Sequence, residues 1–125
     1  MWEKPAGRAA VGFHLQHLTG VLDRMLTYAS GKELSEEQFS ALKMEGDPSA
    51  GNDVSGFVAA FDRKVDHALQ VLSKIEKSSL TEFRSVGRKK LPSSVIGLLF
   101  HAAEHTQRHV GQLLVTASVV KVRPN

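Results

Sequence analysis

The stretch AAVGFHLQHLTGVLDRMLTYAS, residues 9–30, decides the fold because its apolar residues follow the period of a helix. They recur at intervals of three and four residues, at positions 11, 15, 18, 21, 22, 25 and 26. This spacing gathers them on one face of an α-helix and leaves the polar residues on the other face. Gly31 follows directly and suits the left-handed backbone that ends many helices. We therefore predict a long amphipathic helix over residues 9–30.

A short helix is predicted next, over residues 35–46. Ser35 and Gln38 have the spacing of a capping box at its start, and Gly46 ends it. The following residues, 46–53, read GDPSAGND, a composition typical of turns. The short helix and the long helix that follows it are therefore expected to be separate elements.

The rest of the chain predicts two more long helices. One covers residues 53–77, with apolar residues at helical spacing, and the last extends from Pro92 to about Val119, since proline is favoured in a first helical turn. Residues 77–91 are expected to be an irregular link. No segment alternates apolar and polar residues over a convincing length, so no sheet is expected. The predicted fold class is all-α, a helical bundle of three long helices and one short one.

The composition indicates an ordinary globular protein. The chain has 125 residues, of which 42% are hydrophobic and 23% charged, and this size predicts a single domain over residues 1–125. The longest apolar run, residues 95–100, is far too short to cross a bilayer, and the first residues lack the apolar core of a signal peptide. We expect no membrane partner and a cytoplasmic location. Cysteine is absent, which excludes disulfides and thiolate ligands, so nitrogen and oxygen must hold any metal.

The charge of the chain first suggests a nucleic-acid partner. The formal net charge is +3, but most basic residues are scattered among acidic ones. Only RSVGRKK, residues 84–90, forms a basic cluster, and no aromatic residue lies within it to stack on a base. We predict a solvated loop there and no nucleic-acid partner.

The last predicted helix contains HAAEHTQRHVGQ, residues 101–112, in which His101, His105 and His109 follow one another at steps of four. Residues four apart lie on neighbouring turns of a helix, so the three imidazoles form one polar stripe. A metal would satisfy them together, while an exposed stripe or a hydrogen-bonded interior network would satisfy them separately. The first helix adds His14 and His17, either of which could supply a further ligand, and helical position alone does not choose between them.

Two other histidine features are given structural roles. HAAEH, residues 101–105, matches the inverted zinc-protease motif with Glu104 as the base, but such proteases are far larger domains and the match is short. We reject that function and expect Glu104 to pair with Arg108 on the helix surface. His67, alone on the third helix, is expected to be a surface or structural residue.

Two separated motifs carry a family resemblance. They are H-L-x-G-x-x-D-R in residues 17–24 and H-x-x-x-H-x-x-x-H-x-G-Q in the last helix, and with the segments around them the chain resembles the DinB superfamily from residue 2 to residue 121. The resemblance implies a four-helix bundle that binds a divalent metal ion, zinc or nickel, through three histidines from two helices. Carried over by motif, the ligands are His17, His105 and His109. His14, His101 and Gln112 lie beside them as candidates to support the ligands or to face a substrate.

The resemblance also implies a chemistry on small molecules. Relatives include metal-dependent enzymes that use low-molecular-weight thiols such as bacillithiol, mycothiol and glutathione. The implied function is a metal-dependent transferase acting on a small molecule with a thiol as co-substrate. A metal-dependent hydrolase and a non-catalytic metal-binding module remain the alternatives.

The chain differs from the family on the N-terminal side of the matching segment. Family members usually carry a long helix before the segment that matches WEKPAGRAAVGFHL, which here begins at residue 2. A bundle without that helix would expose apolar surface beyond what a monomer normally shows. We therefore expect a homodimer in which a second copy covers the exposed faces.

Overall fold

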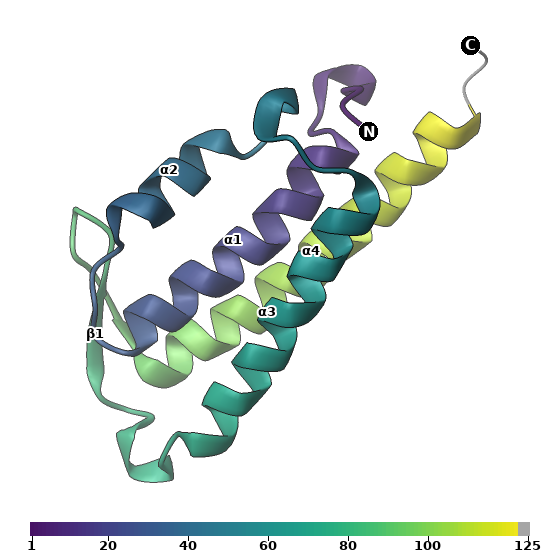
Figure 1. Cartoon of the computed structure of the whole chain (residues 1–125). Coiled ribbons are helices and arrows are strands. Elements are labelled where there is room, and N and C mark those ends of the chain that lie inside the picture. The colour runs from purple at the N-terminus through teal and green to yellow at the C-terminus, as the bar shows by residue number, and fades with distance from the viewer. Residues whose placement is uncertain (123–125) are drawn as a thin grey trace.

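A computed structural model describes residues 1–122 of the chain, and it confirms the four predicted helices (Figure 1). These are α1 (Val11–Ala29), α2 (Glu36–Met44), α3 (Val54–Lys74) and α4 (Val95–Val122). Short 3-10 helices cover Pro5–Gly7, Pro48–Ala50 and Lys77–Ser79, and two short strands precede α4: β1 (Phe83–Val86) and β2 (Leu91–Ser94). None of the helices within residues 1–122 combines the length and the apolar character needed to cross a membrane.

The signals that the sequence places at the helix ends act as predicted. The Ser35 side chain accepts a hydrogen bond from the Gln38 backbone N–H, and the Gln38 side chain accepts one from the Ser35 backbone N–H. These two bonds satisfy amide groups that the first turn of α2 would otherwise leave unpaired. Gly31, two residues after the last residue of α1, has a φ of 81°, a conformation that costs glycine little and other residues more.

The absence of a sheet was a wrong prediction. Strands β1 and β2 form an antiparallel hairpin in which Phe83 pairs with Ser94 and Val86 with Leu91. Pro92, which we expected to open the last helix, lies in β2 instead, and α4 begins three residues later. A two-stranded hairpin has only edge strands, and these tolerate a proline that cannot donate to the ladder.

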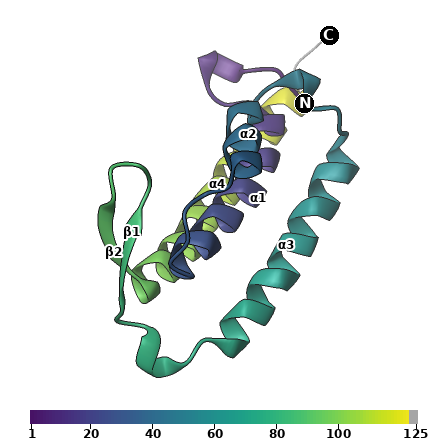
Figure 2. The same cartoon turned by 60° about the vertical axis from the view of Figure 1, so that its left-hand side comes forward.

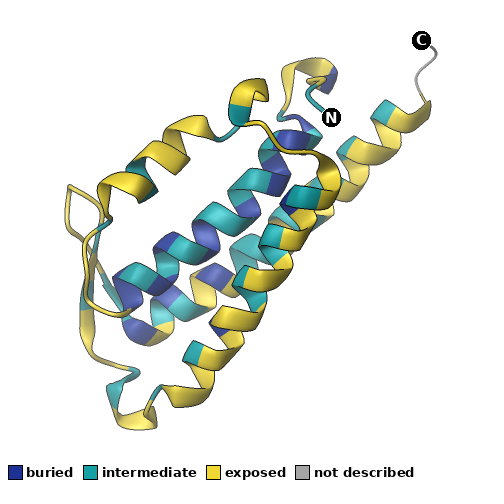
Figure 3. Ribbon diagram, viewed as in Figure 1, coloured by how far each residue is buried: buried dark blue, intermediate teal, exposed yellow. Residues whose placement is uncertain are grey.

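Helix α1 is the centre of the bundle. It packs against α4 along one side and α3 along another, and it carries many of the buried residues, whereas α2 is largely exposed (Figure 3). One buried cluster joins the three long helices and consists of Leu22, Leu26, Ala68 and Ala102. A second joins the end of α1 to the start of α4 and consists of Tyr28, Ala29 and Leu98. This packing fixes α1 and α4 side by side, which is what positions the histidines.

Helix α3 stands apart from α4 (Figure 2). Between them, with α1 as its floor, lies an apolar groove of about 280 Å³. Its walls include Val65, Leu69 and Leu72 of α3 and Leu99 of α4. Leu69 and Leu72 are exposed, so the bundle leaves apolar surface uncovered along this groove.

Candidate metal centre

The three ligands that the resemblance implies meet where α1 lies against α4. His17 comes from α1, and His105 and His109 come from consecutive turns of α4. One ring nitrogen of each lies within 4.8 Å of the others. The Nε2 atoms of His17 and His105 are 3.0 Å apart, and the His109 ring centre is 4.5 Å from that of His17 and 4.4 Å from that of His105. Three imidazoles from two helices therefore converge on one point.

The distances and the charge of this cluster suit a divalent ion. Zinc binds imidazole nitrogen at about 2.0–2.1 Å with tetrahedral geometry, which separates two such nitrogens by about 3.4 Å. The 3.0 Å between His17 and His105 needs only a few tenths of an ångström of opening. Burial, and then the neighbouring imidazoles, lower the pKa of His109 to about 4; burial, and then the charges of His17 and Arg108, also lower the pKa of His105. Both rings are thus neutral at pH 7, as a metal ligand must be.

His14 lies behind this group of three. Its side chain is buried, with 3% of the residue exposed, and its Nδ1 atom is 3.0 Å from Nδ1 of His109. Burial, and then the charge of His17, lower the pKa of His14, so it too is neutral. When His109 donates the proton of this hydrogen bond, its own Nε2 atom keeps a free lone pair. His14 therefore supports His109, and His17 is the α1 histidine that contacts both α4 rings.

The other two candidate residues lie at the rim. The side chain of His101 is 48% exposed and its ring centre is 5.2 Å from that of His105. Gln112 is exposed, and within residues 1–122 no hydrogen bond joins its side chain to the cluster. The structure therefore brings His101 to the edge of the group and leaves Gln112 outside it.

The expected pairing of Glu104 with Arg108 is wrong. Glu104 binds His101 instead, with 2.8 Å between Oε1 and Nδ1. Arg108 turns back by three residues and places Nη2 at 2.6 Å from Nδ1 of His105. Glu104 and Arg108 therefore each bind a neighbouring imidazole and do not bind one another.

Two residues that sequence analysis missed contact His17. Glu45, the residue after α2, accepts a hydrogen bond of 2.8 Å from Nδ1 of His17 and another of 2.8 Å from Nη1 of Arg24. Burial disfavours the charge on Glu45, but these two bonds outweigh it, so that its pKa is lowered. Phe13 stacks on the His17 ring, with ring centres 4.9 Å apart and planes 19° from parallel. Hydrogen bonding and stacking together fix the orientation of His17.

The basic cluster at 84–90 is partly engaged in packing. Arg84 donates from Nε to the backbone carbonyl of Ala29 at 2.8 Å and so caps the end of α1. The guanidinium of Arg88 lies 4.7 Å from the centre of the Phe39 ring. Lys89 and Lys90 are exposed in the hairpin loop. Two of the four basic side chains therefore stabilise the fold.

Comparison with known proteins agrees with the two separated histidine motifs. The family model of the DinB superfamily matches residues 1–113, which include all three converging histidines. No curated protein and no solved structure matched the chain. Since the family match covers most of the sequence, the chain belongs to the DinB superfamily.

Proposed function

We propose that this protein binds one divalent metal ion, zinc or nickel, through His17, His105 and His109 and acts at that ion on a small molecule. The observation that carries the proposal is the approach of one nitrogen from each ring to within 4.8 Å of the others. The lowered pKa of His109 adds support, because a neutral ring binds a cation without first losing a proton. The family membership supports the same site.

When bound by three imidazoles, such an ion keeps an open coordination position and acts as a Lewis acid that lowers the pKa of a thiol or water. The residues of the chain hold and orient the three rings. Phe13 covers one face of His17, and buried His14 supports His109. His101, half-exposed and bound to Glu104, is the side chain at the rim that could take a proton from a substrate at its Nε2 atom.

The substrate we propose is a low-molecular-weight thiol, whose thiolate sulfur forms a bond to an electrophilic small molecule and displaces its leaving group. The chain has no cysteine, so any thiolate in the reaction must come from outside the protein. A thiolate is also the form of a thiol that attacks electrophiles. The thiol chemistry of the relatives that the chain resembles points to the same class of co-substrate.

Cobalt-substituted protein tests the function directly. Titration with bacillithiol, mycothiol and glutathione should produce a thiolate-to-cobalt charge-transfer band with at least one of them. The His105→Gln variant, which removes one ligand, should lose the band. Absence of any band at millimolar concentrations of all three thiols would contradict the thiol function and favour a hydrolase or a structural metal.

A further inference from the structure

Glu45 is a buried carboxylate outside the group of three histidines. Only 6% of its side chain is exposed, and its two oxygens are bound separately, one by His17 and the other by Arg24. A buried charge is costly unless charged or hydrogen-bonding partners compensate for it. The end of α2 therefore places the Glu45 carboxylate against α1, where His17 and Arg24 each bind one of its oxygens.

Gly20 makes this contact possible. A Cβ atom at Gly20 would collide with Oε1 of Glu45 and would lie 2.7 Å from Nη1 of Arg24. The Glu45–Arg24 ion pair thus lies over the backbone of α1 at Gly20, where no side chain intervenes. Glycine within a helix costs about 1 kcal/mol relative to alanine, so its presence here has a packing reason.

The hydrogen bond to Glu45 decides which nitrogen of His17 is free. An ionised carboxylate only accepts hydrogen bonds, so Nδ1 of His17 must carry the proton. In the neutral form of His17, the form that can bind a metal, the lone pair then lies on Nε2, the atom 3.0 Å from Nε2 of His105. Hydrogen bonds of this kind fix the tautomer and the orientation of metal-binding histidines.

We propose that Glu45 is the positioning residue of the metal site, that Arg24 holds its carboxylate in place, and that Gly20 leaves the space over α1 that this pair occupies. The proposal rests on the proposed metal site at His17, His105 and His109. It accounts for the glycine and the arginine of H-L-x-G-x-x-D-R, neither of which belongs to the three ligands. A simpler role, in which Glu45 only ties α2 to α1, makes different predictions.

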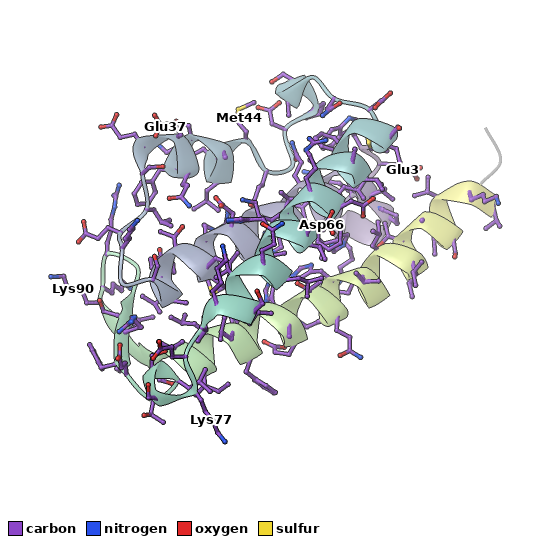
Figure 4. The ribbon with its side chains drawn as sticks, turned by 60° about the horizontal axis from the view of Figure 1, so that its bottom comes forward. Glu3, Glu37, Met44, Asp66, Lys77 and Lys90 are labelled. Carbon is purple, nitrogen blue, oxygen red and sulfur yellow. The ribbon has the colours of Figure 1, made fainter. Side chains whose placement is uncertain are left out.

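The test is the Glu45→Gln variant. Its amide can donate to Nδ1 of His17, which would move the imidazole proton to Nε2. We expect zinc affinity, measured by competition with a chelating dye, to fall about 10- to 100-fold. Glu37→Gln makes the same change in charge on the exposed side of α2 and should alter affinity by less than about twofold; Glu37 projects away from the other helices (Figure 4). A Glu45→Gln protein that is less stable but binds zinc with wild-type affinity would overturn the proposal.

A second readout separates this proposal from the metal site itself. The ¹⁵N chemical shifts of the His17 ring, measured without metal, should show the proton on Nδ1 in the wild type and a shift toward Nε2 in Glu45→Gln. This measurement is informative even if the wild-type protein binds no metal, in which case the proposed function fails instead. Gly20→Ala, which keeps both charged side chains but displaces their ends, should weaken zinc binding to a smaller degree. An unchanged His17 tautomer in Glu45→Gln would contradict the positioning role, and wild-type affinity in Gly20→Ala would show that the ion pair needs no glycine there.

Discussion

At the scale of single residues, a chain of hydrogen bonds sets the protonation of the candidate site. Arg108 donates to Nδ1 of His105, so the proton of neutral His105 lies on Nε2 and faces Nε2 of His17. Nδ1 of His17 in turn donates to Glu45. To bind a metal through Nε2, His105 must carry its proton on Nδ1, where the guanidinium opposes it. Glu45 thus favours the tautomer of His17 that can bind a metal through Nε2. Arg108 disfavours the corresponding tautomer of His105.

Replacement of Arg108 should therefore strengthen metal binding. Arg108→Gln removes a positive charge near the ion and supplies an amide oxygen that can accept a proton from Nδ1 of His105. Two like charges about 4 Å apart in water repel one another by about 1 kcal/mol. Loss of this repulsion between the guanidinium and the ion should raise zinc affinity about 3- to 10-fold. Competition with a chelating dye measures the change, and Arg63→Gln, on the exposed side of α3, is the matched control. Weaker binding in Arg108→Gln would show that the guanidinium supports the ligand instead.

The sequence predicted the histidines of the site but not the groups that hold them. His17, His105 and His109 belong to motifs with fixed local spacing, so a family resemblance could assign them. Glu45 follows His17 by 28 residues and lies at the end of a different helix, where no local spacing relates the two. The signal that could have revealed the contact is Gly20, since a glycine in the middle of a long helix indicates the close approach of another group.

At the scale of the elements, the helices were predictable and the hairpin was not. Each long helix repeats its apolar positions over about four turns or more, and a repeat of that length identifies the structure by itself. Strands β1 and β2 have four residues each, and one of them contains a proline. Such short strands show too few alternations to differ from a loop, and what stabilises them is tertiary: Val86 packs against the core and Arg84 caps α1.

Asp23 joins three helices through hydrogen bonds, and its replacement should weaken the fold. It lies on α1 and accepts hydrogen bonds of 2.9 Å from Gln38 of α2 and 2.9 Å from Lys64 of α3. Because the carboxylate is partly exposed, we expect Asp23→Asn to lower the free energy of unfolding by about 1 kcal/mol at pH 7. Urea denaturation of the metal-free protein measures the loss. Asp66→Asn, an exposed site on α3 (Figure 4), should change stability little.

The pH dependence of that loss has a definite sign. Burial favours the neutral form of Asp23, but the bonds from Gln38 and Lys64 outweigh it and its pKa is lowered from 3.8. A carboxyl whose pKa is lower in the folded state stabilises the fold above its unfolded pKa, and the contribution disappears as pH falls through the folded pKa. The difference between wild type and Asp23→Asn should therefore be full at pH 7 and shrink below about pH 4. A difference that grew on acidification would contradict this role.

At the scale of the whole molecule, the apolar groove between α3 and α4 supports the expected homodimer. The last turns of α4 extend beyond the other helices (Figure 1) and expose Leu114 and Val115, while Leu69 and Leu72 remain exposed at the groove. A twofold dimer would bury these surfaces together. Light scattering at micromolar concentration should give about twice the chain mass.

A charge in the groove should separate the two copies. Leu72→Glu is expected to give a folded monomer, because Leu72 is partly exposed in the single chain. Phe83→Glu makes the same change in charge on the exposed hairpin and should leave the dimer intact. A wild-type chain that is a cooperative monomer and binds no hydrophobic dye would contradict the dimer.

The most direct test of the central claim is the metal content and zinc affinity of single histidine variants. The wild type and His67→Gln, a change on the exposed side of α3, should each bind about one equivalent of zinc per chain. His17→Gln, His105→Gln and His109→Gln should each bind far more weakly, because each removes one of three ligands, and His14→Gln should lose less. Wild-type zinc affinity in His17→Gln, together with loss of binding in His14→Gln, would contradict the assignment of His17 as the α1 ligand.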